Sequence, residues 1–424
     1  MSEYNTDQLM TSYQRTRDYS LQLFTHLAAE DVNLQAAEFV SPPKWHLAHT
    51  TWFFETFILK AFVSGYKALR SEYEYLFNSY YNAVGDLYSR PHRGLLTRPL
   101  TEEVIRYREY VDSHIRDLLS VTGNAIHSEV IKRIQLGIQH EQQHQELFLT
   151  DIKYSFFQNP TFPVFSNKSD VHSEELTPLN WHKFEGGLAK IGVSESDETF
   201  SFDNESPSHQ VFLSPFLLAN RLVTNGEFME FVLDDGYKRP EFWLSDGWKV
   251  VQDNQWQQPL YWVRRAGELQ EYTLYGMQPW HPNNPVSHLS AFEADAFACW
   301  AKARLPTEFE WEFAVKQNKI SDQMVSSFHP QPANGDEKNL GLSQIYDTCW
   351  QWTSSAYRPY PGFRACEGAI GEYNGKFMCN QWVLRGGSCA TSAGHARATY
   401  RNFFYPQDRW QFTGLRLARD LIEQ

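Results

Sequence analysis

The residues of this chain best suited to chemistry are two histidines in a stretch with helical periodicity. Residues 137–150 have the sequence G-I-Q-H-E-Q-Q-H-Q-E-L-F-L-T, in which His140 and His144 are four positions apart. Residues at this spacing share one face of an α-helix, so both imidazoles can bind a single metal ion. Gly137 precedes His140 by about one helical turn and leaves space beside it. The spacing therefore predicts a metal site, but it does not identify the metal.

A third nitrogen ligand is available from a second stretch with helical periodicity. The sequence K-W-H-L-A-H follows two prolines and places His46 and His49 three positions apart. Either histidine could supply the third imidazole, and the residues alone do not choose between them. Three neutral imidazoles with open coordination positions suit zinc-dependent hydrolysis and ferrous oxygen chemistry equally well.

The H-E-x-x-H pattern from His140 to His144 is also the motif of a class of zinc proteases. Those proteases take a third ligand from further along the chain, often a histidine of an H-x-x-G-x-x-H continuation or a later glutamate. Here the continuation is Q-E-L-F-L-T-D, which contains neither glycine nor histidine. Its glutamate, Glu146, lies about 200° around a helix from His144 and does not easily reach the same ion. Protease activity is therefore disfavoured.

Length and composition restrict the class of protein. A chain of 424 residues exceeds one compact core, so at least two domains are expected. The formal net charge of −13 argues against binding to nucleic acid. A basic, apolar leader and apolar runs of about 18 residues are both missing, so neither secretion nor membrane spanning is expected. The five cysteines form no C-x-x-C pair, which fits a reducing, cytoplasmic location.

The elements that must position these histidines belong to a helical first part of the chain. Helical periodicity predicts four long helices there, with one long connection at about 65–98. The predicted helices span residues 7–27, 45–59, 99–119 and 124–157. This pattern predicts a four-helix bundle, whose core is a usual place for a metal site.

The second part of the chain follows a different pattern. Residues 161–179 are polar and punctuated by prolines, which predicts a linker between a domain at 1–160 and a domain at 180–424. In the latter range, short apolar runs alternate with glycine-containing turns, and helical patterns are few. The clearest of them is S-A-F-E-A-D-A-F-A-C-W-A-K-A. A loop-rich α+β domain is therefore expected.

From about Trp181 onward, the chain resembles the formylglycine-generating-enzyme and sulfatase-modifying family, whose fold is C-type-lectin-like. The matching words occur in family order: E-G-G-L-A-K-I-G, F-D-N-E-S-P-S-H-Q-V-F-L, L-V-T-N-G-E-F-M-E-F, A-R-L-P-T-E-F-E-W-E-F-A, W-Q-W-T-S-S-A-Y, L-R-G-G-S-C-A-T and Y-R-N-F-F. Oxidising members of that family use a reactive cysteine pair. Here His395 stands where many relatives carry cysteine and only Cys389 lies nearby, so formylglycine generation is not expected.

The first part of the chain resembles the DinB-like helical bundle, whose H-x-x-x-H-x-E signature is His140, His144 and Glu146 here. Joined to the second part, the whole chain resembles the sulfoxide synthases of ergothioneine biosynthesis. Those are non-heme iron(II) enzymes that use O2 to join a thiol to C2 of a histidine-derived imidazole. The resemblance implies Fe(2+) as cofactor, held by His49, His140 and His144. It places His46 at a position that is not a ligand.

The resemblance also implies the substrates. They are Nα-trimethylhistidine, O2 and a thiol, which is either cysteine or γ-glutamylcysteine. Free cysteine is favoured, because Phe404 stands where members that use γ-glutamylcysteine carry an aspartate. Contacts to trimethylhistidine are expected from Gln143, Asn402, Phe403 and Phe404. Contacts to the carboxylate of the sulfur donor are expected from Arg90 and Arg93. Tyr81 or its neighbour Tyr80 is the expected proton donor, with Tyr357 and Tyr360 as alternatives.

Several alternatives stay open from the sequence. The same scaffold serves ovothiol-type enzymes, which take histidine itself, and enzymes that take a selenium donor. Zinc-dependent thiol transfer and a non-catalytic module that binds metal or senses thiols are further alternatives. All of these would have small molecules as partners, without nucleic acid or a membrane, and the sequence decides neither for nor against a homo-oligomer.

Overall fold

The computed structural model describes residues 6–120, 128–167, 177–194, 197, 199–318, 327–333 and 341–421. The chain divides into two compact units. Unit 1 contains residues 1–165 and 365–373, and unit 2 contains residues 166–364 and 374–424. The predicted fold class, a helical first part followed by an α+β second part, is confirmed. The predicted linker at 161–179 includes residues 168–176, which lie outside the described residues, and its boundaries stay a prediction.

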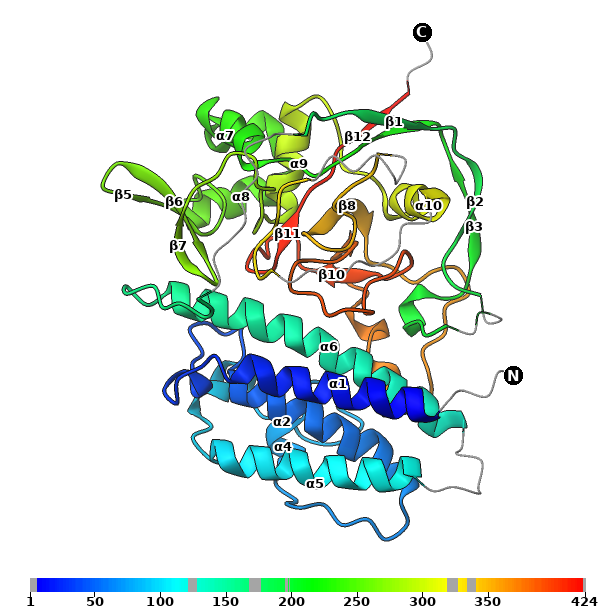
Figure 1. Ribbon diagram of the computed structural model, residues 1–424. Helices are drawn as coiled ribbons and strands as arrows, with labels where there is room; N and C mark the ends of the chain where they lie inside the picture. Colours follow the sequence, from blue (N-terminus) through cyan, green and yellow to red (C-terminus); the bar gives the residue numbers. More distant parts are fainter. Residues whose placement is uncertain are drawn as a thin grey trace. The chain divides into compact units, whose positions relative to one another are not determined.

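Unit 1 is built on four long helices that lie side by side (Figure 1). They are α1 (Thr6–Phe24), α2 (Pro43–Phe54), α5 (Thr101–Ser120) and α6 (Ser128–Phe157). Helix α2 packs against α5 and α6, and α1 packs against α6. The predicted start of the last helix near residue 124 lies outside the described residues.

Shorter elements complete unit 1. Helix α2 runs on through a π-helical turn (Glu55–Leu59) into α3 (Lys60–Phe62). The long connection that follows contains α4 (Tyr73–Phe77) and a 3-10 helix (Arg90–Leu95), and another 3-10 helix (Asp31–Asn33) precedes α2. Among the described helices, none combines the length and the apolar character needed to cross a bilayer.

Helix α2 is the central helix of unit 1. Every residue from Pro43 to Phe54 is buried, including Lys44, His46 and His49. Burying a polar side chain is unfavourable unless a partner satisfies it, so each of these residues must have a specific partner within the bundle. The partners of the two histidines lie on α6 and on the connection that follows α2, and they define the site described below.

The described residues of unit 2 form four small sheets. The first consists of β1 (Trp181–Phe184), β4 (Phe216–Ala219) and β12 (Ala418–Asp420). The second has the order β10 (Asn402–Phe404), β9 (Trp382–Arg385), β8 (Trp350–Ala356) and β11 (Thr413–Gly414). The third pairs β2 (Gly187–Ile191) with β3 (His209–Leu213), and the fourth consists of β5 (Trp262–Arg265), β6 (Glu268–Thr273) and β7 (Gly276–Pro279). Each pair of neighbouring strands is antiparallel, except β8 and β11.

The helices of unit 2 are α7 (Asn225–Leu233), α8 (Ser245–Asn254), α9 (Ala291–Trp300) and α10 (Glu308–Asn318). The helix predicted from S-A-F-E-A-D is α9. The Ser290 side chain caps its first turn by accepting a hydrogen bond from the Glu293 amide, and the Glu293 carboxylate accepts one from the Ser290 amide. Helix α10 packs against β2, β3, β8 and β9, with Trp311 fully buried in the core.

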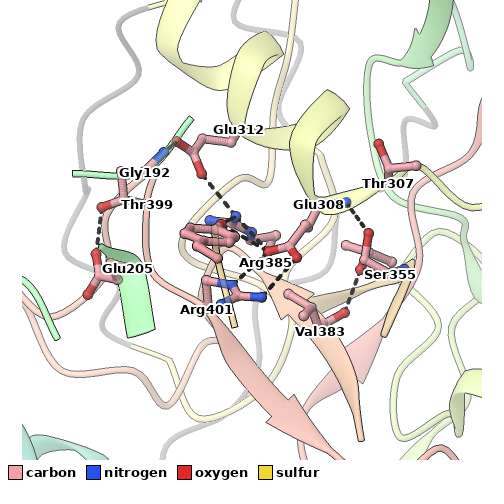
Figure 2. Close-up of polar contacts among 12 residues, drawn as sticks. Gly192, Glu205, Thr307, Glu308, Glu312, Ser355, Val383, Arg385, Thr399 and Arg401 are labelled. Atoms are coloured by element: carbon pink, nitrogen blue, oxygen red, sulfur yellow. Dashed lines mark hydrogen bonds and ion pairs between the residues drawn. The ribbon is translucent and has the colours of Figure 1, made fainter. Parts of the chain in front are cut away.

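The core of unit 2 also contains buried charges (Figure 2). Glu308 of α10 accepts hydrogen bonds from Arg385 at 2.9 Å and from Arg401 at 2.8 Å. Glu312, one helical turn later, accepts a second bond from Arg385 at 2.9 Å. All four side chains are at most 2% exposed. Buried charges are tolerated only when they are paired and hydrogen-bonded. Removing any one of these four side chains would therefore deprive another buried charge of a partner.

Candidate metal centre

Three histidines of unit 1 converge on one point. His49 on α2 and His140 and His144 on α6 each offer one ring nitrogen, and these atoms all lie within 4.8 Å of one another. The Nε2 atoms of His49 and His140 are 3.2 Å apart. In the part of the chain that the structure describes, no other group of three histidine, cysteine or acidic side chains is arranged to hold a metal ion.

Close packing of α2 against α6 brings the three histidines together. A Cβ atom on Gly137 would lie 2.5 Å from Cε1 of the Phe54 ring. A larger residue at this position would therefore push the two helices apart. The space that Gly137 leaves one turn before His140 is thus filled by Phe54 of α2.

Aromatic rings fix the orientation of the imidazoles. Trp45 stacks on His49 with ring centroids 4.6 Å apart and an interplanar angle of 9°. Trp52 stacks on the same imidazole at 5.6 Å and 18°, and Phe53 stacks on His140 at 4.3 Å and 30°. These aromatic rings limit rotation of the imidazoles and give the site apolar walls.

The hydrogen bond made by the other ring nitrogen sets the tautomer of His49. Its Nδ1 atom is 2.7 Å from the carbonyl oxygen of Phe77. A carbonyl oxygen only accepts hydrogen bonds, so Nδ1 of His49 carries the proton and donates it. The Nε2 atom is left with a free lone pair, which is the form that binds a metal.

Burial keeps the three imidazoles neutral. Loss of solvation lowers the pKa of His140 to about 3. It also lowers the pKa of His49 and of His144 well below 6.5, and the neighbouring imidazoles add to the effect at both residues. A metal ion binds the neutral imidazole, so the ligands do not have to lose a proton near neutral pH.

The structure distinguishes His46 from His49, between which the residues alone did not choose. His49 belongs to the cluster of three. His46 lies beside it, with Nδ1 2.9 Å from Nδ1 of His144 and Nε2 3.2 Å from Oδ2 of Asp151. Sequence reasoning missed Asp151. Its position seven residues after His144 places it about two helical turns further along the same face of α6, and this spacing was the available signal.

The donor set fits a divalent transition-metal ion. Three neutral nitrogen donors are typical of sites that hold zinc or a ferrous ion and keep coordination positions open. His140 fits this donor set, because its Nε2 atom lies 3.2 Å from Nε2 of His49, so the two nitrogens are close enough to bind one ion. Glu146 is not part of the cluster.

A buried ionic network braces α6, the helix that carries His140 and His144. Glu141, next to His140, accepts hydrogen bonds from Arg17 of α1 at 2.8 Å, from Ser20 of α1 at 2.6 Å and from Arg108 of α5. Burial alone would raise the pKa of this carboxyl, but the two guanidinium groups outweigh it and lower the pKa to about 2. The network therefore ties α1 and α5 to α6 at the level of the metal site.

Both units of the chain match known protein families. Residues 12–148 match the DinB superfamily, and residues 183–421 match the Sulfatase-modifying factor enzyme 1-like domain. A hercynine oxygenase of Mycolicibacterium smegmatis is 32% identical over 324 residues, which cover 68% of this chain and 72% of that protein. The chain belongs to the hercynine oxygenase family.

Other members of the hercynine oxygenase family and its wider relatives agree with this assignment. A hercynine oxygenase of Mycobacterium tuberculosis is 33% identical over 253 residues, which cover 54% of this chain and 59% of that protein. Ergothioneine biosynthesis protein 1 of Neurospora crassa is 22% identical over 419 residues, which cover 76% of this chain and 47% of that protein. The chain thus spans about half to three quarters of the length of these relatives. The resemblance predicted from the sequence motifs is confirmed.

The two tyrosines predicted as proton donors, Tyr80 and Tyr81, lie within unit 1 of this member of the hercynine oxygenase family. Tyr81 is fully buried, and its hydroxyl is 3.3 Å from that of the half-buried Tyr80. The Tyr81 ring contacts Trp52, which also stacks on His49. Burial raises the pKa of Tyr81 well above 10, and the neighbouring Tyr80 raises it further. Tyr81 is therefore protonated near neutral pH.

A further tyrosine beside the metal centre was not predicted. Tyr373 comes from the 365–373 segment, which belongs to unit 1. Its ring centroid is 5.7 Å from that of His140, and its hydroxyl donates to the side-chain oxygen of Gln143. The adjacent Glu372 accepts hydrogen bonds from the backbone amides of residues 82 and 83, next to the tyrosine pair. No local pattern links these segments, because nearly 300 residues separate them.

The two arginines predicted to bind the sulfur donor have different surroundings. Arg93 is buried, its guanidinium carbon lies 3.4 Å from the centroid of the Trp45 ring, and its Nη1 donates to the Ser41 hydroxyl at 2.9 Å. Arg90 is exposed and donates to the carbonyl oxygen of Phe39. Arg93 is thus linked through Trp45 to the stacked imidazole of His49.

The remaining predicted residues lie in unit 2. Asn402, Phe403 and Phe404 form β10, where Phe403 stacks on Tyr357 with ring centroids 4.1 Å apart and an interplanar angle of 11°. The hydroxyl of Tyr360 donates to Glu308 at 3.2 Å and accepts from Arg385 at 2.8 Å. These contacts place Tyr357 and Tyr360 in the core of unit 2. The roles of all five residues toward a substrate stay predictions.

Proposed function

We propose that this chain is an iron(II)- and O2-dependent sulfoxide synthase of ergothioneine biosynthesis. The reaction joins the sulfur of cysteine to C2 of the imidazole of hercynine, which is Nα-trimethylhistidine. One C–H and one S–H bond are lost, a C–S bond and a sulfoxide S=O are formed, and O2 accepts four electrons to give the sulfoxide oxygen and one water. The observation that carries the proposal is the cluster of three neutral imidazoles in a hercynine oxygenase family member.

His49, His140 and His144 would hold the iron. When bound, an iron(II) ion supplies the capacity to activate O2 and open positions for the substrates. Because the three ligands are neutral, they leave the positive charge of the site uncompensated, which favours the thiolate form of the sulfur donor. The aromatic walls formed by Trp45, Trp52 and Phe53 exclude water from the reacting groups.

Cationic and aromatic side chains are suited to the two organic substrates. Arg93 is a buried cation bonded to a neutral hydroxyl, and within the described residues no ion pair joins it to a carboxylate, so it can bind the carboxylate of cysteine. The exposed Arg90 is assigned to the same substrate. The quaternary ammonium of hercynine cannot donate a hydrogen bond, so aromatic faces and amide oxygens suit it. We assign this role to Gln143, Asn402, Phe403 and Phe404.

Tyr81 is the proposed proton donor to the reduced oxygen. Replacing it with phenylalanine is expected to lower the rate of sulfoxide formation by roughly 100-fold or more, a typical effect of losing a general acid. Phenylalanine preserves the ring contact with Trp52, so the metal affinity should not change. Single-turnover product formation, followed by mass spectrometry, measures the rate. Tyr373→Phe is the competing variant, and loss of its bond to Gln143 should lower the rate by less than loss of the Tyr81 hydroxyl does. The opposite ranking would identify Tyr373 as the donor.

Oxygen uptake tests the proposed function directly. The full chain, loaded anaerobically with iron(II) and supplied with hercynine and cysteine, is expected to consume one O2 for each sulfoxide formed. Replacing iron with zinc should abolish the uptake, and γ-glutamylcysteine should give a lower kcat/KM than cysteine because Phe404 offers no carboxylate to its amine. Uptake only with histidine or with a selenium donor would reassign the substrates. The proposal would fail if the iron-loaded chain consumed no O2 with any donor, or if zinc supported thiol transfer.

A further inference from the structure

We propose that His46 and Asp151 form a hydrogen-bond relay that fixes the tautomer of His144, so that His144 presents Nε2 to the metal. The inference rests on the proposed metal site and adds two positioning residues that do not bind the metal themselves. The relay begins on α6 at Asp151, crosses to His46 on α2 and returns to α6 at His144.

The carboxylate of Asp151 determines which ring nitrogen of His46 carries the proton. Its Oδ2 atom accepts a hydrogen bond from the backbone amide of Ser41 at 2.8 Å and lies 3.2 Å from Nε2 of His46. An ionised carboxylate can only accept hydrogen bonds, so the proton of a neutral His46 must be on Nε2. The amide of Ser41 holds the carboxylate in place for this contact.

The proton on Nε2 of His46 determines where the ring proton of His144 lies. A neutral imidazole carries a single ring proton, so Nδ1 of His46 is an acceptor. It lies 2.9 Å from Nδ1 of His144, and two nitrogens at this distance must share one proton. Nδ1 of His144 therefore donates to His46, and the lone pair of His144 is on Nε2. His49 reaches the same tautomer independently, through the carbonyl oxygen of Phe77.

The positions of these residues suit a relay. His46 precedes the proposed ligand His49 by three residues on α2, and Asp151 follows the proposed ligand His144 by seven residues on α6, so each of the two helices carries one relay residue beside its proposed ligands. His46 is 4% exposed and Asp151 is 2% exposed. Water therefore cannot readily replace either partner, and loss of one leaves a buried donor or acceptor unsatisfied.

Metal affinity in a double-mutant cycle tests the relay, with Co2+ as the probe. His46→Leu and Asp151→Leu should each weaken Co2+ binding by roughly 10- to 100-fold, the usual effect of losing a residue that orients a metal ligand. The double variant should bind no more weakly than His46→Leu, because Asp151 acts through His46. Glu55→Leu is the matched control. It removes a buried carboxylate bonded to Tyr66 and Tyr107, and it should leave the Co2+ affinity within about twofold of the original.

A spectroscopic measurement on the unmodified chain complements the cycle and remains decisive if a variant does not fold. In the 15N-histidine-labelled, Zn2+-loaded full chain, long-range proton–nitrogen NMR should show the ring proton of His144 on Nδ1. A proton on Nε2 would overturn the relay, and so would single-variant affinities within twofold of the original or losses that multiply in the double variant. A chain that shows the relay yet forms no sulfoxide would refute only the proposed function.

Discussion

Replacing His49 with alanine is expected to abolish metal binding by the bundle and, with it, O2 uptake. His49 is one of the three residues whose ligand atoms lie within 4.8 Å of one another, and the only one that comes from α2. Its loss leaves two imidazoles on a single helix, which cannot enclose the ion. We expect the affinity for iron(II) or Co2+ to fall by roughly 1000-fold or more, equivalent to about 4 kcal/mol. Anaerobic titration with metal analysis of the desalted protein measures this loss.

The neighbouring His46 provides the control for this prediction. It is buried on the same helix and has the same side chain, but it is bonded to His144 and Asp151 instead of facing the point where the ligands converge. His46→Leu should therefore weaken binding yet still take up one equivalent of metal at saturation. If His46→Leu removed the metal and His49→Ala retained it, His46 would be the third ligand and the assignment of His49 would be wrong.

Removal of the Glu308 carboxylate is expected to produce the largest loss of stability in unit 2. Glu308→Ala should lower the free energy of unfolding by about 3–5 kcal/mol, the usual effect of breaking a buried ion pair from one side. The change deprives both Arg385 and Arg401 of a buried partner (Figure 2). Glu312 can still pair with Arg385, whereas Arg401 loses both of its bonds to a carboxylate. Denaturant unfolding of the full chain, followed by tryptophan fluorescence, measures the change.

The same carboxylate also makes stability depend on pH. Burial alone would raise the pKa of Glu308, but the adjacent Arg401 and Arg385 outweigh it and hold the pKa below the ordinary value of 4.5. A depressed folded-state pKa gives a stabilisation that is fully present above pH 4.5 and is lost as the pH falls through the lower folded-state value. Glu308→Gln should remove this part of the acid sensitivity.

Glu310, a second glutamate on α10, provides a control because its arginine partner is partly exposed to solvent. Glu310 pairs with Arg304, whose side chain is 31% exposed. Glu310 itself is 7% exposed, but solvent reaches its arginine partner, so Glu310→Ala should lower the free energy of unfolding by less than Glu308→Ala. Equal losses for Glu308→Ala and Glu310→Ala would contradict the proposed importance of the buried network.

Features that depend on local periodicity and on motif order were predictable from the amino-acid sequence. The four-residue spacing of His140 and His144 places both on one face of any α-helix, so it predicted the core of the metal site without tertiary information. The helical pattern of the first part and the glycine-rich words of the second part gave the two-part fold class. The order of those words gave the family resemblance that the comparisons confirmed.

The residues that complete the candidate site could be identified only from the packing of the helices. His46 and His49 are three positions apart on α2 and both face α6. The rotation of one helix against the other therefore selects His49 for the cluster and directs His46 toward Asp151. Tyr373 reaches Gln143 from 230 positions away in the chain. Helical periodicity follows from the backbone of a few consecutive residues, whereas these contacts depend on side-chain packing between distant segments, which no local pattern encodes.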